Sequence, residues 1–262
     1  MVLGGTPPKN PNCLVNLKDA HCGDQIELEV RDQNETVIGC KSGCSAFNRD
    51  DLCCTGAYNL SRTCKPSIYS LTLKKLCDKA ITYPYDDETL FTCRCNATKL
   101  LIKNNCPHKI WPATQSGTGE GAAIPTGFRL ASRGTKKFNL PNPWSGRIWA
   151  RHLCSYSGQN FTCLSGDCRS GSIECDGAGG TPPATLVQFT IANTSDEKDF
   201  YSVSIVDGFN LPVSVTPINR PDCGIADCLV NLKDAHCGDQ IELEVRDQNE
   251  DKMSGAKADA FA

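Results

Sequence analysis

In the segment LVQFTI, residues 186–191, apolar and polar side chains alternate from Val187 to Ile191. In an extended chain its apolar residues fall mainly on one face, and Gln188 and Thr190 fall on the other. This period of two predicts a strand that buries one face in a core. Residues 99–103 and 201–206 alternate in the same way, and short runs of Gly, Pro, Asn and Ser separate such segments. The pattern predicts a mainly β protein built as an antiparallel sandwich.

Two segments depart from the strand pattern and predict helices. Residues 67–75 begin with Ser67, a residue type that caps helix N-termini, and end with Lys74 and Lys75. Two lysines in the last turn complement the negative end of a helix dipole. Residues 40–47 predict a second, shorter helix.

The composition indicates an oxidising compartment. The 262 residues include 18 cysteines, and 39% of the residues are hydrophobic. A chain of this length forms a core without bridges, so the cysteines indicate a disulfide framework and secretion. The net charge of −3 argues against a nucleic-acid binder. The sequence has no apolar stretch long enough to span a membrane, so we expect no membrane span. The four histidines and the cysteine spacings predict no metal site, and no motif indicates a cofactor.

Five Asn-x-Ser/Thr sequons also favour an extracellular location. The first nine residues, MVLGGTPPK, lack the apolar run of a signal peptide. We therefore expect a secreted glycoprotein whose leader is not part of this chain. The expected glycosylation sites are Asn34, Asn59, Asn96, Asn160 and Asn193.

One segment of the chain occurs twice. CLVNLKDAHCGDQIELEVRDQNE stands, letter for letter, at residues 13–35 and again at 228–250. Such identity indicates a recent duplication, an artefact, or a sequence that is cut across two tandem copies of one domain. The second copy runs into DKMSGAKADAFA, which has neither a strand nor a helix pattern. We therefore expect residues 251–262 to be a disordered tail and residues 1–12 a flexible lead.

Read from residue 98 to 250 and then from 36 to 96, the chain forms one continuous domain. In that order it resembles the thaumatin-like family of pathogenesis-related proteins. The motifs that carry the resemblance are KLLIKNNCPHKIWPA (99–113), WSGRIWARHLC (144–154), CLSGDC (163–168), VDGFNLPV (206–213), GCKSGCSAFNRDDLCC (39–54) and PSIYSLTLKKLCDKAITYPYDD (66–87). The resemblance implies a circular permutation, with the family's C-terminal half first. It also implies that the family's last strand, an edge strand, is missing, which would expose unpaired backbone groups or produce a slipped register.

The family's fold is an antiparallel β-sandwich with disulfide-rich loop and helix subdomains. By resemblance, the sandwich core comprises residues 78–153 and 178–227, and a small disulfide loop comprises residues 154–177. Residues 13–77 then form the disulfide-rich subdomain with short helices, and residues 228–250 repeat part of it. The permuted halves close within one chain as a monomer or swap between two chains as a dimer.

The resemblance also implies a set of bridges. The two copies of the repeat compete for Cys77 and for Cys40. We expect the first copy to supply both partners, because the loop from its second cysteine to Cys40 is short and closes at a low entropic cost. The expected bridges are Cys154–Cys163, Cys168–Cys175, Cys93–Cys223, Cys44–Cys53, Cys54–Cys64, Cys13–Cys77, Cys22–Cys40 and Cys95–Cys106.

The family has a cleft lined by one Arg, one Glu and three Asp. By motif, the Arg corresponds to Arg147, and two of the Asp correspond to Asp207 and Asp50. The position of the Glu holds Gln188, and that of the remaining Asp holds Ser202. The resemblance therefore implies a cleft that has lost two negative charges but keeps its capacity for hydrogen bonds.

These substitutions bear on the expected chemistry. Glycoside hydrolysis canonically needs one carboxylic acid as proton donor and a second carboxylate. With the family's Glu replaced, we expect a non-catalytic, secreted defence-type protein that binds β-1,3-glucan or another fungal-wall polysaccharide. Two alternatives stay open: a weak endo-β-1,3-glucanase that uses Asp207 and Asp50, and a functionally silent fragment of a tandem or mis-joined gene.

Overall fold

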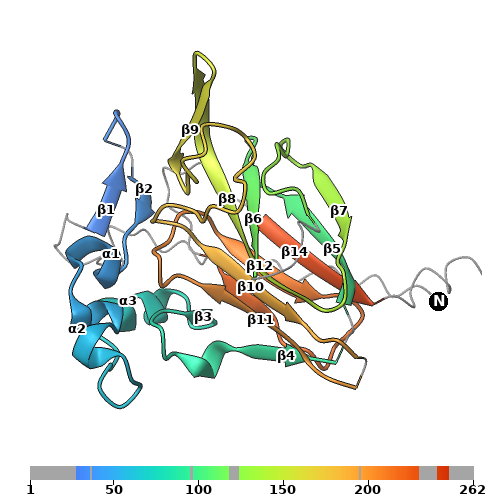
Figure 1. Cartoon of the computed structure of the whole chain (residues 1–262), viewed down its shortest axis with the longest axis horizontal. Coiled ribbons are helices and arrows are strands. Elements are labelled where there is room, and N and C mark those ends of the chain that lie inside the picture. Colours follow the sequence, from blue (N-terminus) through green and yellow to red (C-terminus); the bar gives the residue numbers. More distant parts are fainter. Residues whose placement is uncertain are drawn as a thin grey trace, which may run out of the picture.

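The computed structural model describes residues 28–35, 37–94, 97–117, 124–194, 196–229 and 241–247. Within these ranges, only the backbone is described for residues 97–98 and for residues 241–247 other than Leu243. The expected flexible lead and disordered tail lie outside the described residues. The chain forms a mainly β fold with two large sheets and a group of short helices beside them (Figure 1).

The larger sheet has seven strands and carries the motif-derived residues of the cleft. Its central strands are antiparallel neighbours, and one short strand runs parallel to its partner. The order along the main path is β3 (Ala80–Ile81), β11 (Asp199–Ser204), β10 (Leu186–Ile191), β8 (Trp144–Ser157) and β6 (Trp111–Ser116), with β4 (Phe91–Cys93) on β11 and β9 (Asn160–Ser165) on β8.

The second sheet has five strands. Their order is β13 (Ala226–Cys228), β12 (Val213–Pro217), β14 (Ile241–Asp247), β5 (Ala97–Asn104) and β7 (Thr135–Asn139). Strand β5 has no unpaired edge, because it pairs with β14 on one side and β7 on the other, and its register with β14 shifts between Arg246 and Asp247. Strand β14 belongs to the second copy of the repeat, so the duplicated segment fills the place beside β5.

The core lies between the two sheets. Val187, Phe189 and Ile191 of β10 are each at most 3% exposed and pack in one cluster with Ile102 of β5 and Leu243 of β14. The alternation in LVQFTI therefore produces the predicted buried face. The opposite face of β10 points away from this core and carries the polar side chains.

The short helices lie beside the large sheet, next to a two-stranded hairpin (Figure 1). Helix α3 is capped by Ser67, whose hydroxyl accepts a hydrogen bond from the Ser70 amide, as the sequence predicts. The second predicted helix is shorter than expected, because Cys40 ends a strand. The elements are β1 (Glu29–Arg31), β2 (Val37–Cys40), α1 (Gly43–Phe47), α2 (Asp50–Cys53), η2 (Gly56–Tyr58), α3 (Ile68–Leu76) and η3 (Asp87–Thr89).

The structure forms five of the bridges that the resemblance implies. These are Cys44–Cys53, Cys54–Cys64, Cys93–Cys223, Cys154–Cys163 and Cys168–Cys175. Cys106 is also disulfide-bonded, and its expected partner Cys95 lies outside the described residues. Cys40 is buried in β2, and its expected partner Cys22 lies outside them too.

The expected bridge from Cys13 to Cys77 is wrong. Cys77 bonds to Cys228 of the second copy instead. Cys228 ends β13, which pairs with β12, so the sheet holds this cysteine next to its partner. Sheet pairing therefore outweighs the small entropic advantage of a nearer cysteine, because loop-closure entropy grows slowly with loop length.

Among the described residues, no helix is long and apolar enough to cross a membrane.

Candidate functional site

A row of polar residues crosses the outer face of the seven-stranded sheet. Gln188 of β10 pairs with Arg147 of β8 on one side and with Ser202 of β11 on the other. Arg147 in turn pairs with Gln115 of β6. Directly paired residues on neighbouring strands place their side chains on the same face. We call Gln115, Arg147, Gln188 and Ser202 the polar row.

The polar row is held together by its own hydrogen bonds and by the loop beside it. The Ser202 hydroxyl donates to Oε1 of Gln188 at 3.4 Å. Nε2 of Gln115 donates to the carbonyl of Gly177 at 2.9 Å. Ser202 is buried, Gln188 and Gln115 are partly buried and Arg147 is exposed, so the row is most open at Arg147.

One side of the polar row is closed by an apolar cluster. The cluster lies two residues along the strands from the polar row and packs under the loop that the Cys168–Cys175 bridge closes. Its members on the sheet are Ala113, Trp149 and Leu186. Nε1 of Trp149 donates to the carbonyl of Gly166 at 2.8 Å, which fixes this loop on the sheet. The row therefore has a rigid wall on that side.

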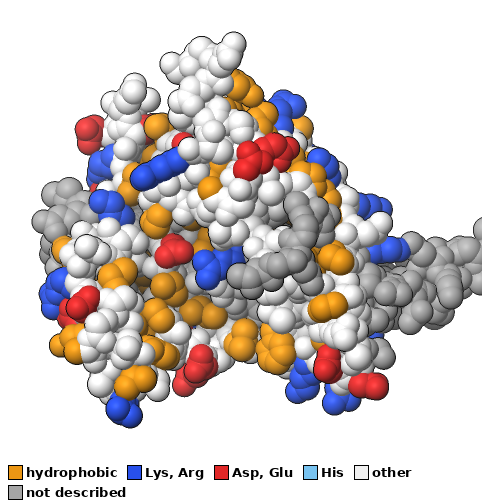
Figure 2. All heavy atoms as spheres, in the orientation of Figure 1, with side chains coloured by type: hydrophobic (Ala, Val, Ile, Leu, Met, Phe, Trp, Pro, Cys, Tyr) orange, Lys and Arg blue, Asp and Glu red, His pale blue; other side chains and the backbone are white. Residues whose placement is uncertain are grey.

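On the other side the sheet face is open. A shallow depression of about 500 Å³, open to solvent, lies over strands β6, β8 and β10. Its lining includes Gln115, Ser145, Arg147, Gln188 and Thr190. Charged side chains are scattered over the face shown in Figure 2, and neither sign gathers into one patch. The depression is thus a mainly neutral polar surface, large enough for a small ligand.

Asp207 lies in the loop after β11 and is half-buried. Burial raises the pKa of its carboxyl group, and the positive charge of Arg147 lowers that pKa in part. The interaction places Asp207 within electrostatic reach of the polar row. A carboxyl with a raised pKa is a better proton donor near neutral pH than an ordinary aspartate.

Asp50 lies on helix α2, outside the large sheet. It is exposed in the first turn of α2, and its Oδ1 accepts a hydrogen bond of 2.6 Å from the Thr55 hydroxyl. Gly56 has a φ of 54°, and a Cβ there would lie 2.6 Å from Oδ2 of Asp50. Within the part of the chain that the structure describes, no hydrogen bond or ion pair joins Asp50 to the polar row or to Asp207. Its local contacts serve the turn.

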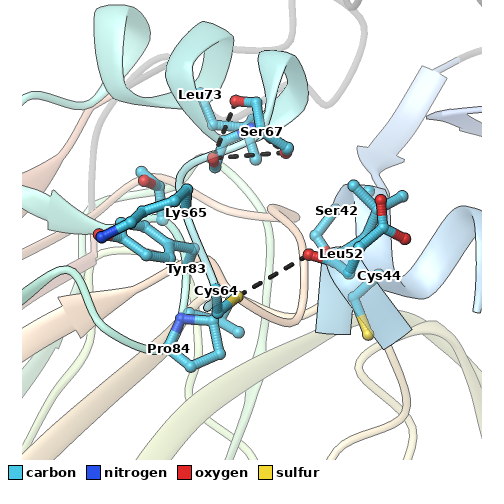
Figure 3. Close-up of a pocket in the computed structure, with 14 residues that line it drawn as sticks. Ser42, Cys44, Leu52, Cys64, Lys65, Ser67, Leu73, Tyr83 and Pro84 are labelled. Atoms are coloured by element: carbon cyan, nitrogen blue, oxygen red, sulfur yellow. Dashed lines mark hydrogen bonds between the residues drawn. The ribbon is translucent and has the colours of Figure 1, made fainter. Parts of the chain in front are cut away.

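A second, much smaller pocket of about 10 Å³ lies among the short helices (Figure 3). Ser42, Leu52, Lys65 and Tyr83 line it, and so does Val206, the residue before Asp207. Burial raises the pKa of the Tyr83 hydroxyl, and the nearby acidic residues 86–88 raise it further. Sequence patterns do not reveal this pocket, because its lining comes from four separated segments with no shared motif.

The expected glycosylation sites and the search for a metal site complete the comparison with the sequence. Asn34, Asn59, Asn160 and Asn193 are exposed, and Asn96 lies outside the described residues. No group of three or more metal-ligating side chains occurs in the described ranges. Gln115 was missed as a member of the row, because its segment WPATQS shows no alternation from which its face could be read.

A model of one protein family, described as the thaumatin family, matches the chain in two segments, residues 3–103 and 104–260. The chain belongs to the thaumatin family. The match covers nearly all of the sequence, including the strands that carry the polar row.

Several curated proteins are similar to this thaumatin-family chain. Thaumatin-like protein 1a of Malus domestica is 42% identical over 60% of this chain and 64% of its own length. A protein of Prunus avium named glucan endo-1,3-beta-glucosidase is 42% identical over 58% of this chain and 62% of its own length. An osmotin-like protein of Solanum lycopersicum is 47% identical over 51% of this chain and 53% of its own length.

The chain spans between half and two thirds of the length of these relatives. Among solved structures, that of a thaumatin-like xylanase inhibitor is 21% identical, with a TM-score of 0.39 over 55% of this chain and 97% of the other.

Proposed function

We propose that this thaumatin-family chain is a secreted, non-catalytic defence-type protein that binds β-1,3-glucan or a related fungal-wall polysaccharide at the polar row. The observation that carries the proposal is the pairing of two neutral side chains, Gln188 and Ser202, at the positions where the resemblance implies carboxylates. The disulfide framework and the exposed sequons support an extracellular location.

The row has the groups that bind a neutral sugar. The amide groups of Gln115 and Gln188 both donate and accept hydrogen bonds, and the exposed Arg147 guanidinium donates several. Sugar hydroxyls also donate and accept, so such a row complements them without requiring charge on the ligand. The wall beside Trp149 confines the ligand to one side.

The row is poorly equipped for hydrolysis. Asp207 is a carboxyl group with a raised pKa and so a candidate proton donor. Hydrolysis also needs a second carboxylate, as nucleophile or as base. Asp50 accepts its hydrogen bond from Thr55 in a turn outside the row. Gln188 cannot take this part, because an amide neither ionises nor activates water as a base.

A weak endo-β-1,3-glucanase is the second candidate. Two observations favour it: the relative from Prunus avium carries that activity in its name, and Asp207 keeps a raised pKa. Even so, loss of one acid–base group typically lowers the rate by about 10²–10⁴-fold.

Retention on insoluble β-1,3-glucan, measured together with release of reducing ends from laminarin, tests both candidates. We expect the unaltered protein to be retained without releasing reducing ends, and Arg147→Ala to weaken the retention. The double variant Gln188→Glu/Ser202→Asp restores the two carboxylates, and we expect it to gain turnover. Gln159→Glu is the matched control, because Gln159 is an exposed glutamine in the β8–β9 turn.

Two results would overturn the proposal in different directions. Turnover of laminarin by the unaltered protein, abolished by Asp207→Ala, would establish the glucanase. A folded protein that binds no fungal-wall fraction would instead favour a functionally silent chain.

A further inference from the structure

A second row of residues lies beside the polar row on the open side of the sheet. Thr190 of β10 pairs with Ser145 of β8 on one side and with Phe200 of β11 on the other. The hydroxyl oxygens of Ser145 and Thr190 are 3.5 Å apart. We call Ser145, Thr190 and Phe200 the outer row. It lies two residues along the strands from the polar row, which is about 6.7 Å.

The outer row faces the same side as the polar row. Side chains two residues apart on a strand point to the same face, so Thr190 lies beside Gln188, and Phe200 beside Ser202. Ser145 and Thr190 line the same depression as Arg147 and Gln188. Phe200 is not part of the lining and borders the depression through its pairing with Thr190.

Phe200 is the aromatic member of the outer row. Its side chain is 39% exposed, whereas the next residue, Tyr201, is 3% exposed and packs in the core. One exposed aromatic residue is ordinary on a protein surface. Here the ring stands at the end of a row of hydroxyls, and Phe200 pairs on its other side with Thr92 of β4. An apolar ring next to hydrogen-bonding groups is the composition of a site for a ligand with both kinds of surface.

We propose that the outer row is a sugar subsite, at which a pyranose ring of the bound polysaccharide stacks on Phe200 and its hydroxyls bond to Ser145 and Thr190. This inference rests on the proposed function, because the outer row extends the surface on which the polar row binds its ligand. A pyranose ring suits the subsite, since its face carries C–H groups and its edge carries hydroxyls. The negative face of an aromatic ring attracts such C–H groups.

The subsite makes binding depend on the length of the ligand. A short oligosaccharide that occupies only the polar row leaves Phe200 uncovered. A longer one reaches the outer row and gains the stacking contact. Phe200 is therefore expected to set the affinity for long ligands and to leave that for short ones unchanged.

The experiment measures dissociation constants for β-1,3-linked glucose oligosaccharides of increasing length by isothermal titration calorimetry. The proteins are the unaltered chain, Phe200→Ala and Phe200→Trp. For the longest ligand we expect Phe200→Ala to weaken binding about tenfold, and Phe200→Trp to retain or strengthen it. Tyr156→Ala is the matched control, because Tyr156 is 60% exposed on the β8–β9 hairpin and outside both rows.

The outcomes separate this inference from the proposed function. If Arg147→Ala weakens binding at every length but Phe200→Ala matches the unaltered protein at every length, the outer row is no subsite and the polar row still binds. An equal loss at every length in Phe200→Ala also overturns the inference, because it indicates a general disturbance of the sheet. If the unaltered protein binds no oligosaccharide and no insoluble glucan, the proposed function fails and the subsite fails with it.

Discussion

The two copies of the repeat share their sequence, but their described strands pair differently. In the first copy, Glu29–Arg31 forms β1, whose one strand partner among the described residues is β2. In the second copy, the same residue types lie within β14, which pairs with both β12 and β5 inside a five-stranded sheet. An identical local sequence thus forms a hairpin strand in one place and an inner strand in another, because the partners available to it differ.

The difference arises from the sequences that flank each copy. After the first copy the chain turns at residues 32–35, where the amide of Glu35 donates to the carbonyl of Asp32, and TVIGC returns as β2. After the second copy that returning sequence is absent. Its strand instead pairs with two strands whose edges would otherwise be unsatisfied, and buried backbone groups without partners are costly.

Substitution of the first cysteine of each copy should give the largest difference in the free energy of unfolding. Cys228→Ser removes the bridge to Cys77, which spans 151 residues. By the chain-entropy model such a bridge contributes about 5 kcal/mol to the free energy of unfolding. Cys13→Ser is the matched control and should change this free energy little. Urea unfolding without reductant measures both, and a peptide map that links Cys77 to Cys13 in the unaltered protein would contradict the assignment.

The second largest difference in the free energy of unfolding should come from replacing the leucine that occupies the same position in each copy. Leu243 is 2% exposed within an inner strand, and Leu28 is 6% exposed at the start of the hairpin. We expect Leu243→Ala to lower the free energy of unfolding by about 4 kcal/mol and Leu28→Ala by about 2 kcal/mol, because the inner site collapses less. Urea midpoints give the comparison. Equal losses would show that the two environments are energetically alike.

Acid should affect the surroundings of the first copy. Burial and, to a smaller extent, the nearby His108 lower the pKa of His152 to about 4, although a backbone hydrogen bond with Ile38 of β2 raises it in part. Because the unfolded state binds the proton more readily, the stabilisation is complete above about pH 6.5 and is lost as the pH falls to about 4. The loss amounts to about 3 kcal/mol.

Hydrogen exchange at pH 7 and pH 4.5 measures this effect, and amides of β2 should lose protection before those of β14. His152→Asn is the control, because its stability should depend less on pH across that range. Equal loss of protection in both strands would show that acid acts on the whole fold rather than on the hairpin.

The smallest expected effect concerns the surface of the hairpin. Arg31 pairs with Glu29 and donates to the carbonyl of Glu35, but it remains partly exposed. Exposed ion pairs contribute about 0–1 kcal/mol, so Arg31→Ala should lower the free energy of unfolding by less than about 1 kcal/mol. Thermal unfolding at low and high salt tests this. A larger, salt-independent loss would mean that Arg31 packs rather than pairs.

The sequence predicted those parts of the fold that local periodicity determines. The alternation around Gln188 gave the correct strand and its buried face, and Ser67 gave the correct helix cap. Which copy bonds to Cys77 could not be predicted, because identical segments carry no local signal and only sheet pairing decides between them. For the same reason the place of β14 beside β5 was missed.

The residues of the candidate site that lie on regular strands could be predicted from the sequence, and the others could not. Arg147, Gln188 and Ser202 stand on paired strands, so motifs that align with strands bring them into one row. Asp50 stands in a helical turn, whose position relative to a sheet follows from no sequence period. Phe200 resembles a core residue by type, and its exposure emerges only once the neighbouring strands are known.

The pairing of β5 with β14 has a consequence for biosynthesis. β5 ends at Asn104, yet the strand that completes its hydrogen bonds begins at Ile241. Domains emerge from the ribosome N-terminus first, so β5 and β12 wait with open edges while the intervening chain is translated. A late-arriving central strand leaves these edges available for pairing with other chains until translation has passed residue 247.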